Sequence, residues 1–208
     1  MDDEQNDLAA RVEARHSRDR VLDSGALRAL AHPLRVRMYD ILSTYGPQTA
    51  SSLAERLGES SGSTSYHLRA LAKHDLIREV PDKGTGRERW WERPDGGVSF
   101  GSPETITSPA GRAASQVVMS EFLRNRNDQL LAFVGHGLDR IEESWRDSSL
   151  ISTATTSLTP EQARDLTLKI QALVDETVDT YRHQQGDDVR RVSIRADVFP
   201  LPDLGDPS

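Results

Sequence analysis

The sequence predicts a mainly helical α+β protein with two folded parts. Three observations predict this class. Apolar residues recur at helical spacing over residues 24–74, two β-prone segments flank a glycine-containing loop at residues 81–86, and apolar and polar residues alternate over residues 192–198. The length of 208 residues allows two small domains, and 36% apolar positions are enough for packed cores.

The first helices are delimited by polar and proline residues. Residues 1–22 are charge-dense with few large apolar side chains, so we expect a flexible or marginally helical arm. A helix begins at Ser24. His32 and Pro33 end it and open a second helix, because proline suits a first helical turn. We expect His32 to satisfy a local backbone hydrogen bond, and the Gly-Pro pair at residues 46–47 to end the second helix.

Two short helices joined by a tight turn come next. Thr49 is suited to cap the first of them, and Gly58 to end it in the left-handed conformation. The second is expected over residues 61–74. Its inward residues are Thr64, Leu68 and Leu71. Two such helices form a helix-turn-helix.

A β-hairpin is expected directly after these helices. Residues 76–80 and 87–92 are β-prone, and the loop between them, Pro-Asp-Lys-Gly-Thr-Gly, favours a reversal of the chain. The hairpin adds a wing, so residues 23–93 predict a winged helix-turn-helix domain. Alternation along the second strand sends one ring of the Trp90 and Trp91 pair into the core.

The remaining chain predicts a linker and a second domain. Residues 94–109 are rich in proline and glycine, which is typical of a linker. Residues 110–200 then form an α+β domain, followed by a tail at residues 201–208. The elements expected in this domain are a long helix at 110–146, a strand at 150–156, a helix that begins at Thr159 and Pro160, and a strand at 192–198. We expect this domain to hold a homodimer together, and a small-molecule effector, if there is one, to act on it.

Positive charge is concentrated in the winged domain. The whole chain has a net charge of -7, whereas residues 23–93 carry 11 Lys and Arg against 9 Asp and Glu. The basic residues on the third helix and the wing are Arg69, Lys73, Arg78, Lys83, Arg87 and Arg89. Small side chains at Ser61, Gly62 and Ser63 let the backbone of that helix approach a groove. This combination predicts double-stranded DNA as a partner, because neutralised phosphates release counterions.

Four segments occur in order within residues 27–92. They are Leu-Ala-His-Pro-Leu-Arg at 30–35, Leu-Ala-Glu-Arg-Leu-Gly at 53–58, Ser-Tyr-His-Leu-Arg-Ala-Leu at 65–71 and Gly-Arg-Glu-Arg-Trp-Trp at 86–91. Together they resemble the winged-helix domain of ArsR-type bacterial transcriptional regulators. The resemblance implies a homodimer that binds a two-fold related operator, more often as a repressor. It places Ser63, Ser65, Tyr66, His67 and Arg69 nearest the bases, and Arg87 near the minor groove or backbone.

The expected DNA contacts combine this resemblance with the basic cluster. They are Ser61, Ser63, Ser65, Tyr66, His67, Arg69, Lys73, Lys83, Arg87 and Arg89. Two alternatives stay open: a winged-helix adaptor that binds another protein without binding DNA, and a regulator that responds to a metal through histidine and carboxylate ligands. Asp175, Asp179 and His183 have the i, i+4, i+8 spacing for such a metal site, although an exposed polar stripe is the favoured interpretation.

Several classes of function are disfavoured. The absence of cysteine excludes disulfides, thiolate metal sensing and cysteine nucleophiles. No P-loop, dinucleotide fingerprint, HExxH helix or G-x-S-x-G elbow occurs, so we expect neither an enzyme nor a cofactor. No apolar run approaches the ~18 residues of a membrane helix, and residues 1–7 lack the apolar core of a secretory signal. We therefore expect a cytoplasmic protein with no membrane partner.

Overall fold

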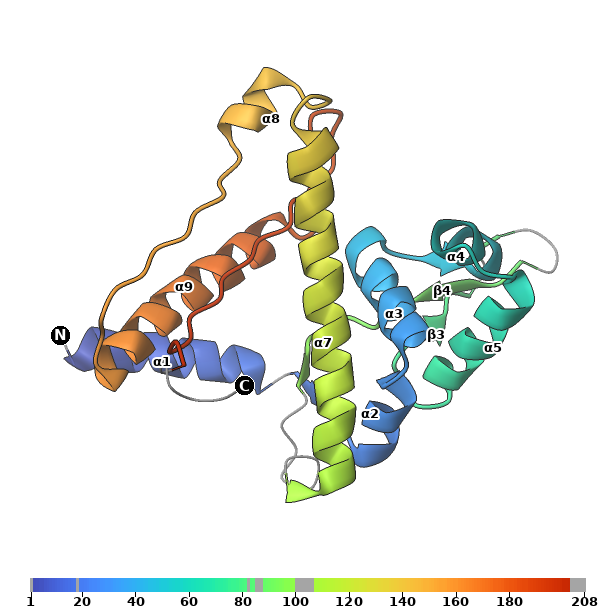
Figure 1. The fold of residues 1–208 in the computed structure, drawn as a ribbon, viewed down its shortest axis with the longest axis horizontal. Coiled ribbons are helices and arrows are strands. Elements are labelled where there is room, and N and C mark those ends of the chain that lie inside the picture. The colour runs from blue at the N-terminus through green and yellow to red at the C-terminus, as the bar shows by residue number, and fades with distance from the viewer. Residues whose placement is uncertain (1, 18, 82, 85–87, 100–106, 203–208) are drawn as a thin grey trace. The chain divides into compact units, whose positions relative to one another are not determined.

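The computed structural model describes residues 2–17, 19–81, 83–84, 88–99 and 107–202 (Figure 1). The chain divides into two compact units. The larger unit comprises residues 19–150. The smaller unit combines residues 1–18 with residues 151–208, so it is built from both ends of the sequence.

The larger unit is mainly helical. Its elements are β1 (Arg20–Val21), α2 (Ser24–Leu30), α3 (Pro33–Tyr45), β2 (Gln48–Thr49), α4 (Ala50–Leu57), α5 (Ser61–Ala72), β3 (Arg78–Glu79), β4 (Trp90–Glu92), β5 (Val98–Ser99), α7 (Pro109–Ala132), the π-helix η1 (Phe133–Gly137) and α8 (Glu143–Asp147). Strands β2, β4 and β3 form an antiparallel sheet in that order, with Gln48 opposite Trp91 and Arg78 opposite Glu92. The predicted hairpin is therefore confirmed, with shorter strands than expected.

Apolar side chains of α2, α3, α5 and α7 meet in one core. Its fully buried members include Leu22, Leu27, Leu30, Met38, Leu42, Leu53, Leu68, Leu71, Ile77 and Val118. The residues predicted to begin and end α3 do so in the structure. The backbone N–H of Leu34 donates to Nδ1 of His32 at 3.2 Å, Pro33 occupies the first turn of α3, and Gly46 follows its end. Because its ring caps α3, His32 holds the start of the helix that faces α5.

Helix α7 packs against α2 and α3. Ala114 and Val118 are buried there, and the rings of Tyr39 and Phe122 meet edge to face with centroids 6.3 Å apart. The structure thus groups this helix with the larger unit, whereas the sequence placed it in a separate domain. Its apolar stripe is long enough to complete a core that three short helices leave partly open.

The prediction of one continuous helix over residues 110–146 is wrong. Helix α7 ends at Ala132 and passes into the π-helix η1, and α8 begins only at Glu143. Gly135 and Gly137 lie within η1, and glycine costs about 1 kcal/mol relative to alanine inside a helix. Two such residues in one turn weaken the regular hydrogen-bond ladder at this point.

The smaller unit contains α1 (Asp2–His16) and α9 (Pro160–Tyr181), which pack against each other. Thr159 caps α9 in a capping box with Gln162, as the sequence predicts. Residues 2–16 form a helix in which Val12 is 8% exposed. The packing on α9 explains how a sequence with few apolar residues supports a 15-residue helix.

The predicted strands at residues 150–156 and 192–198 are wrong for the single chain. Both segments lack regular secondary structure, and both carry exposed large apolar side chains. A strand requires a second strand to accept its backbone hydrogen bonds, and alternation alone does not supply one. The mainly helical α+β class holds through the sheets of the larger unit.

Candidate nucleic-acid interface

Helices α4 and α5 both begin with a side-chain cap, and the cap of α4 is reciprocal. The backbone N–H of Ser52 donates to Oγ1 of Thr49 at 3.1 Å, and the backbone N–H of Thr49 donates to Oγ of Ser52 at 3.0 Å. Gly58 ends α4 in the left-handed conformation at φ 68°, as predicted. Ser60 then caps α5 by accepting from the backbone N–H of Ser63 at 3.1 Å. This tight turn sets the direction in which α5 leaves α4.

Helix α5 separates a buried face from an exposed one. Thr64, Leu68 and Leu71 are buried, as the spacing predicts. Tyr66 is 65% exposed and Arg69 is exposed one turn further along. The remaining α5 residues expected at DNA divide as follows: Ser61 and Lys73 are exposed, and Ser63, Ser65 and His67 are half-buried. The exposed face therefore offers hydroxyl, phenol and guanidinium groups from a rigid helix.

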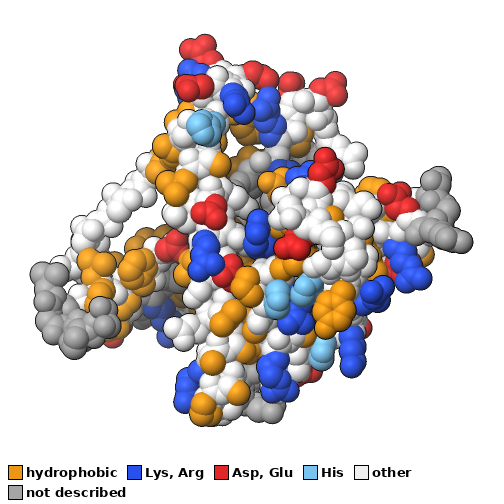
Figure 2. All heavy atoms as spheres, turned by 45° about the vertical axis from the view of Figure 1, so that its right-hand side comes forward, with side chains coloured by type: hydrophobic (Ala, Val, Ile, Leu, Met, Phe, Trp, Pro, Cys, Tyr) orange, Lys and Arg blue, Asp and Glu red, His pale blue; other side chains and the backbone are white. Residues whose placement is uncertain are grey.

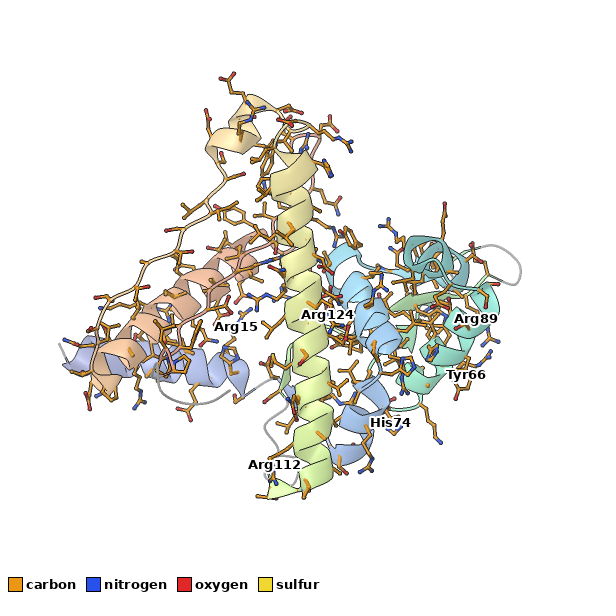
Figure 3. The ribbon with its side chains drawn as sticks, in the orientation of Figure 1. Arg15, Tyr66, His74, Arg89, Arg112 and Arg124 are labelled. Atoms are coloured by element: carbon orange, nitrogen blue, oxygen red, sulfur yellow. The ribbon has the colours of Figure 1, made fainter. Side chains whose placement is uncertain are left out.

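The hairpin adds cations to the same side of the larger unit. Figure 3 labels Tyr66 and Arg89 on this side, and Figure 2 shows Lys, Arg and His side chains gathered over it. Nζ of Lys83 lies 4.5 Å from the centroid of the Trp90 ring, a cation–π contact. Arg87 lies outside the residues that the structure describes.

Two of the hairpin cations are paired with carboxylates of the same hairpin. Nε of Arg78 lies 2.8 Å from Oε1 of Glu92, and a guanidinium nitrogen of Arg89 lies 3.7 Å from Oε2 of Glu79. Both guanidinium groups remain mostly exposed, so these surface pairs are weak and exchange readily with phosphate. The Arg78 pair joins β3 to β4 directly.

The tryptophan pair divides as predicted. Trp91 is buried in the core, and Trp90 lies half-buried beside the hairpin loop. Gly84 has φ +102°, and a Cβ there would lie 2.8 Å from Nε1 of Trp90. Glycine is therefore needed both for the backbone conformation and for the close approach of the indole.

A cluster between α3 and α5 lies beside the exposed face. The rings of His32 and His67 have centroids 4.6 Å apart, and Tyr66 meets His67 edge to face at 5.2 Å. Nδ1 of His67 and Nε of Arg35 are buried without a hydrogen-bond partner among the described residues. Arg35 was not among the expected contacts. Its position beside Tyr66 depends on the packing of α3 against α5, which no local signal reveals.

Burial lowers the pKa of His67 below its ordinary value, and the nearby His32 and Arg35 lower it further against the opposing effect of Glu59. The neutral imidazole is therefore the form that the folded protein favours near neutral pH. Burial also lowers the pKa of Arg35, partly offset by Tyr66.

We expect His67 to titrate below the ordinary histidine pKa of 6.5. Because its folded pKa lies below its unfolded pKa, its neutral form stabilises the fold above about pH 6.5, and this stability is lost as pH falls through the folded pKa. NMR titration of the His67 ring, assigned with His67→Gln, measures the shift. That variant should also lose less urea resistance between pH 7 and pH 5 than the parent does. A His67 pKa at or above 6.5 would contradict this expectation.

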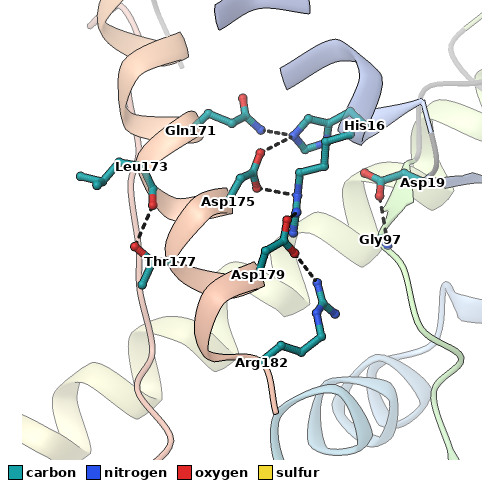
Figure 4. A network of polar contacts seen from close by, with 10 residues as sticks. His16, Asp19, Gly97, Gln171, Leu173, Asp175, Thr177, Asp179 and Arg182 are labelled. Carbon is teal, nitrogen blue, oxygen red and sulfur yellow. Dashed lines mark hydrogen bonds and ion pairs between the residues drawn. The ribbon is translucent and has the colours of Figure 1, made fainter. Parts of the chain in front are cut away.

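The polar stripe on α9 is engaged within the smaller unit (Figure 4). Nε of Arg15 lies 2.9 Å from Oδ1 of Asp175, and Arg15 also pairs with Asp179. His16 and Gln171 are joined at 2.5 Å beside them. Two of the three residues considered for a metal thus serve to hold α1 on α9. No cluster able to hold a metal ion occurs among the described residues.

Comparison with known proteins identifies one part of the chain. Residues 30–80 match a family described as a helix-turn-helix domain. The chain contains a helix-turn-helix domain. It covers α3, α4, α5 and the first strand of the hairpin, and so includes the exposed face of α5. Helix-turn-helix domains serve in DNA-binding regulators, so DNA is the partner that this part of the chain indicates.

Comparisons with curated proteins and with solved structures do not extend this assignment to the rest of the chain. No curated protein matches the chain. Among solved structures, the "Crystal structure of RV1404 from Mycobacterium tuberculosis" aligns with 74% of this chain and 80% of its own, at 18% identity and a TM-score of 0.29. A TM-score this low does not support any inference about the fold or function of this chain. Within the part of the chain that the structure describes, no helix has the length and apolar character to cross a membrane.

Proposed function

We propose that this protein is a sequence-specific transcriptional repressor that binds an inverted-repeat operator as a homodimer. The observation that supports this function is the exposed face of α5. Tyr66 and Arg69 are exposed there, and the opposite face of the helix is buried in the core, which leaves them available to bind DNA. In a helix-turn-helix this helix enters the major groove. The capped N-terminus of α5 would lie near phosphate, since its free N–H groups attract anions.

The hairpin would contact the DNA backbone next to that groove. Lys83 and Arg89 are exposed cations of the hairpin, which suits contact with phosphate. The α5 residues would select sequence and the hairpin would supply salt-dependent affinity.

Fluorescence anisotropy with pooled genomic fragments, including the region upstream of the protein's own gene, tests this function. Retained fragments should share an inverted repeat, and affinity should fall steeply between two salt concentrations. Absence of enrichment, together with absence of binding at low salt, would contradict the proposal and favour an adaptor that binds protein.

The homodimer is proposed from the outer face of α7. Met119 and Leu123 of α7 are each roughly half-exposed on the side opposite Val118, and Val134 of η1, directly after α7, is exposed to a similar degree. Leu123, Asn127, Leu130 and Val134 follow the spacing of 4, 3 and 4 residues found in the seam of a coiled coil. A second copy of α7 would cover this stripe, and Asn127 would fix its register.

Leu123→Asp is expected to dissociate the homodimer, because it would place two carboxylates in one apolar seam. Light scattering at micromolar concentration should change from twice the chain mass to the chain mass. Val117→Asp, at an exposed apolar residue outside the seam, is the matched control and should stay dimeric. A parent protein that is monomeric in the same measurement would contradict the dimer directly.

A further inference from the structure

The segment of residues 189–199 leaves an apolar edge uncovered. Ile194 and Val198 are 48% and 41% exposed, and Phe199 is 66% exposed. The segment has no regular secondary structure, although its apolar and polar residues alternate at the period of a strand. The apolar side chains of this segment are exposed to water, and its backbone has a strand-forming sequence but does not pair with a strand of the same chain among the residues that the structure describes.

The sequence of this segment is complementary to itself when two copies run antiparallel. If Ile194 lies opposite Ile194 of a second copy, Arg191 falls opposite Asp197, and Ser193 falls opposite Arg195. Both Arg191–Asp197 pairs then occur on one face, because a two-fold axis repeats each contact. The opposite face carries Val192 against Ala196 and the central isoleucine pair.

Shifting the register removes this match. Moving the centre by one residue, to Ser193, would place Arg191 opposite Arg195 and leave Asp197 opposite Val189. Like charges directly opposite each other are destabilising in a sheet. The charges therefore select the register centred on Ile194.

Helix α9 supplies an apolar surface within the same unit. Leu173 and Tyr181 are 66% and 60% exposed, and no residue of α9 is buried. A two-stranded ribbon alone is marginally stable in water and needs a helix to cover one face. The apolar face of the paired segments suits α9 for that role.

We propose that residues 189–199 form an antiparallel two-stranded ribbon with the same segment of a second copy, centred on Ile194. The inference rests on the homodimer of the proposed function and adds a second contact to the α7 seam. It makes the predicted strand at residues 192–198 a property of the dimer.

The absence of native cysteine allows a direct test in the full-length protein. Directly opposed residues in an antiparallel pair have Cα atoms about 4.5 to 5.5 Å apart, within disulfide range. Ile194→Cys should therefore form a disulfide-linked dimer when oxidised with diamide, seen on a non-reducing gel. Ser193→Cys is the matched control. Its two copies would lie about 8 Å apart in this register and should remain mostly unlinked.

Charge reversal tests the register. Arg191→Glu and Asp197→Arg should each raise the dimer dissociation constant about tenfold, since each homodimer then contains two like-charged pairs. Mixing the two variants should restore the parent constant, because the heterodimer has both pairs matched. Sedimentation equilibrium measures all three.

The outcomes separate this inference from the homodimer itself. A dimeric parent in which Ile194→Cys links no better than Ser193→Cys would overturn the ribbon and leave the α7 seam intact. Reversals that mixing does not rescue would also overturn it. A monomeric parent would overturn both, whereas operator binding tests the DNA function independently.

Discussion

Arg69→Ala is expected to weaken binding to the operator about ten- to a hundredfold and to relax the choice of base at one position. The physical reason is that Arg69 is exposed on the helix proposed to enter the major groove, where a guanidinium can donate two hydrogen bonds to a guanine, worth about 1 to 3 kcal/mol of discrimination. Fluorescence anisotropy with operator and point-substituted duplexes measures both effects.

Two control variants sharpen this expectation. Arg164→Ala removes an exposed arginine from α9, in the smaller unit, and should leave operator affinity unchanged. Lys83→Ala removes a hairpin cation and should weaken binding equally on all sequences, with a salt slope smaller by about one. If Arg69→Ala matched the parent in affinity and base preference, α5 would not be the recognition helix.

Leu68→Ala is expected to lower the free energy of unfolding of the larger unit by about 2 to 5 kcal/mol. Leu68 is 0% exposed and lies where α5 packs on the core, so truncation removes apolar contacts and leaves a cavity. Urea unfolding followed by circular dichroism measures the change.

Leu150→Ala provides the matched control for this substitution. Leu150 is 86% exposed in the same unit, so the same truncation there should change stability by less than about 0.5 kcal/mol. An equal loss from both variants would show that burial in the core is not what distinguishes them. Leu68→Ala should also lose DNA binding as α5 loses its support.

The DNA-binding half was the more predictable part because its signals are local. Thr49 and Gly58 act within one turn of chain, and Thr64 with Leu68 follows helical spacing. Such signals specify where α4 and α5 begin and end, and which side faces inward. The sequence does not indicate Arg35, because its place beside Tyr66 depends on the packing of α3 against α5.

The C-terminal half was less predictable because its elements pack against segments that are far away in the sequence. Helix α7 has an apolar stripe at positions such as Val118, and periodicity does not reveal which unit that stripe covers. Residues 192–198 have the alternation of a strand, but they can form one only where a second strand lies beside them. Helix α1 has too few apolar residues to indicate a packed helix without its partner α9.

The pairing of Arg15 with Asp179 has a consequence for the order of events during synthesis. The two residues are 164 positions apart, so α1 leaves the ribosome long before α9 exists. At about 5 to 20 residues per second, that interval is on the order of ten to thirty seconds. The helix-turn-helix emerges complete within the interval, as an insertion between the two halves of the smaller unit. A nascent chain thus acquires its DNA-reading part first and closes its terminal unit last.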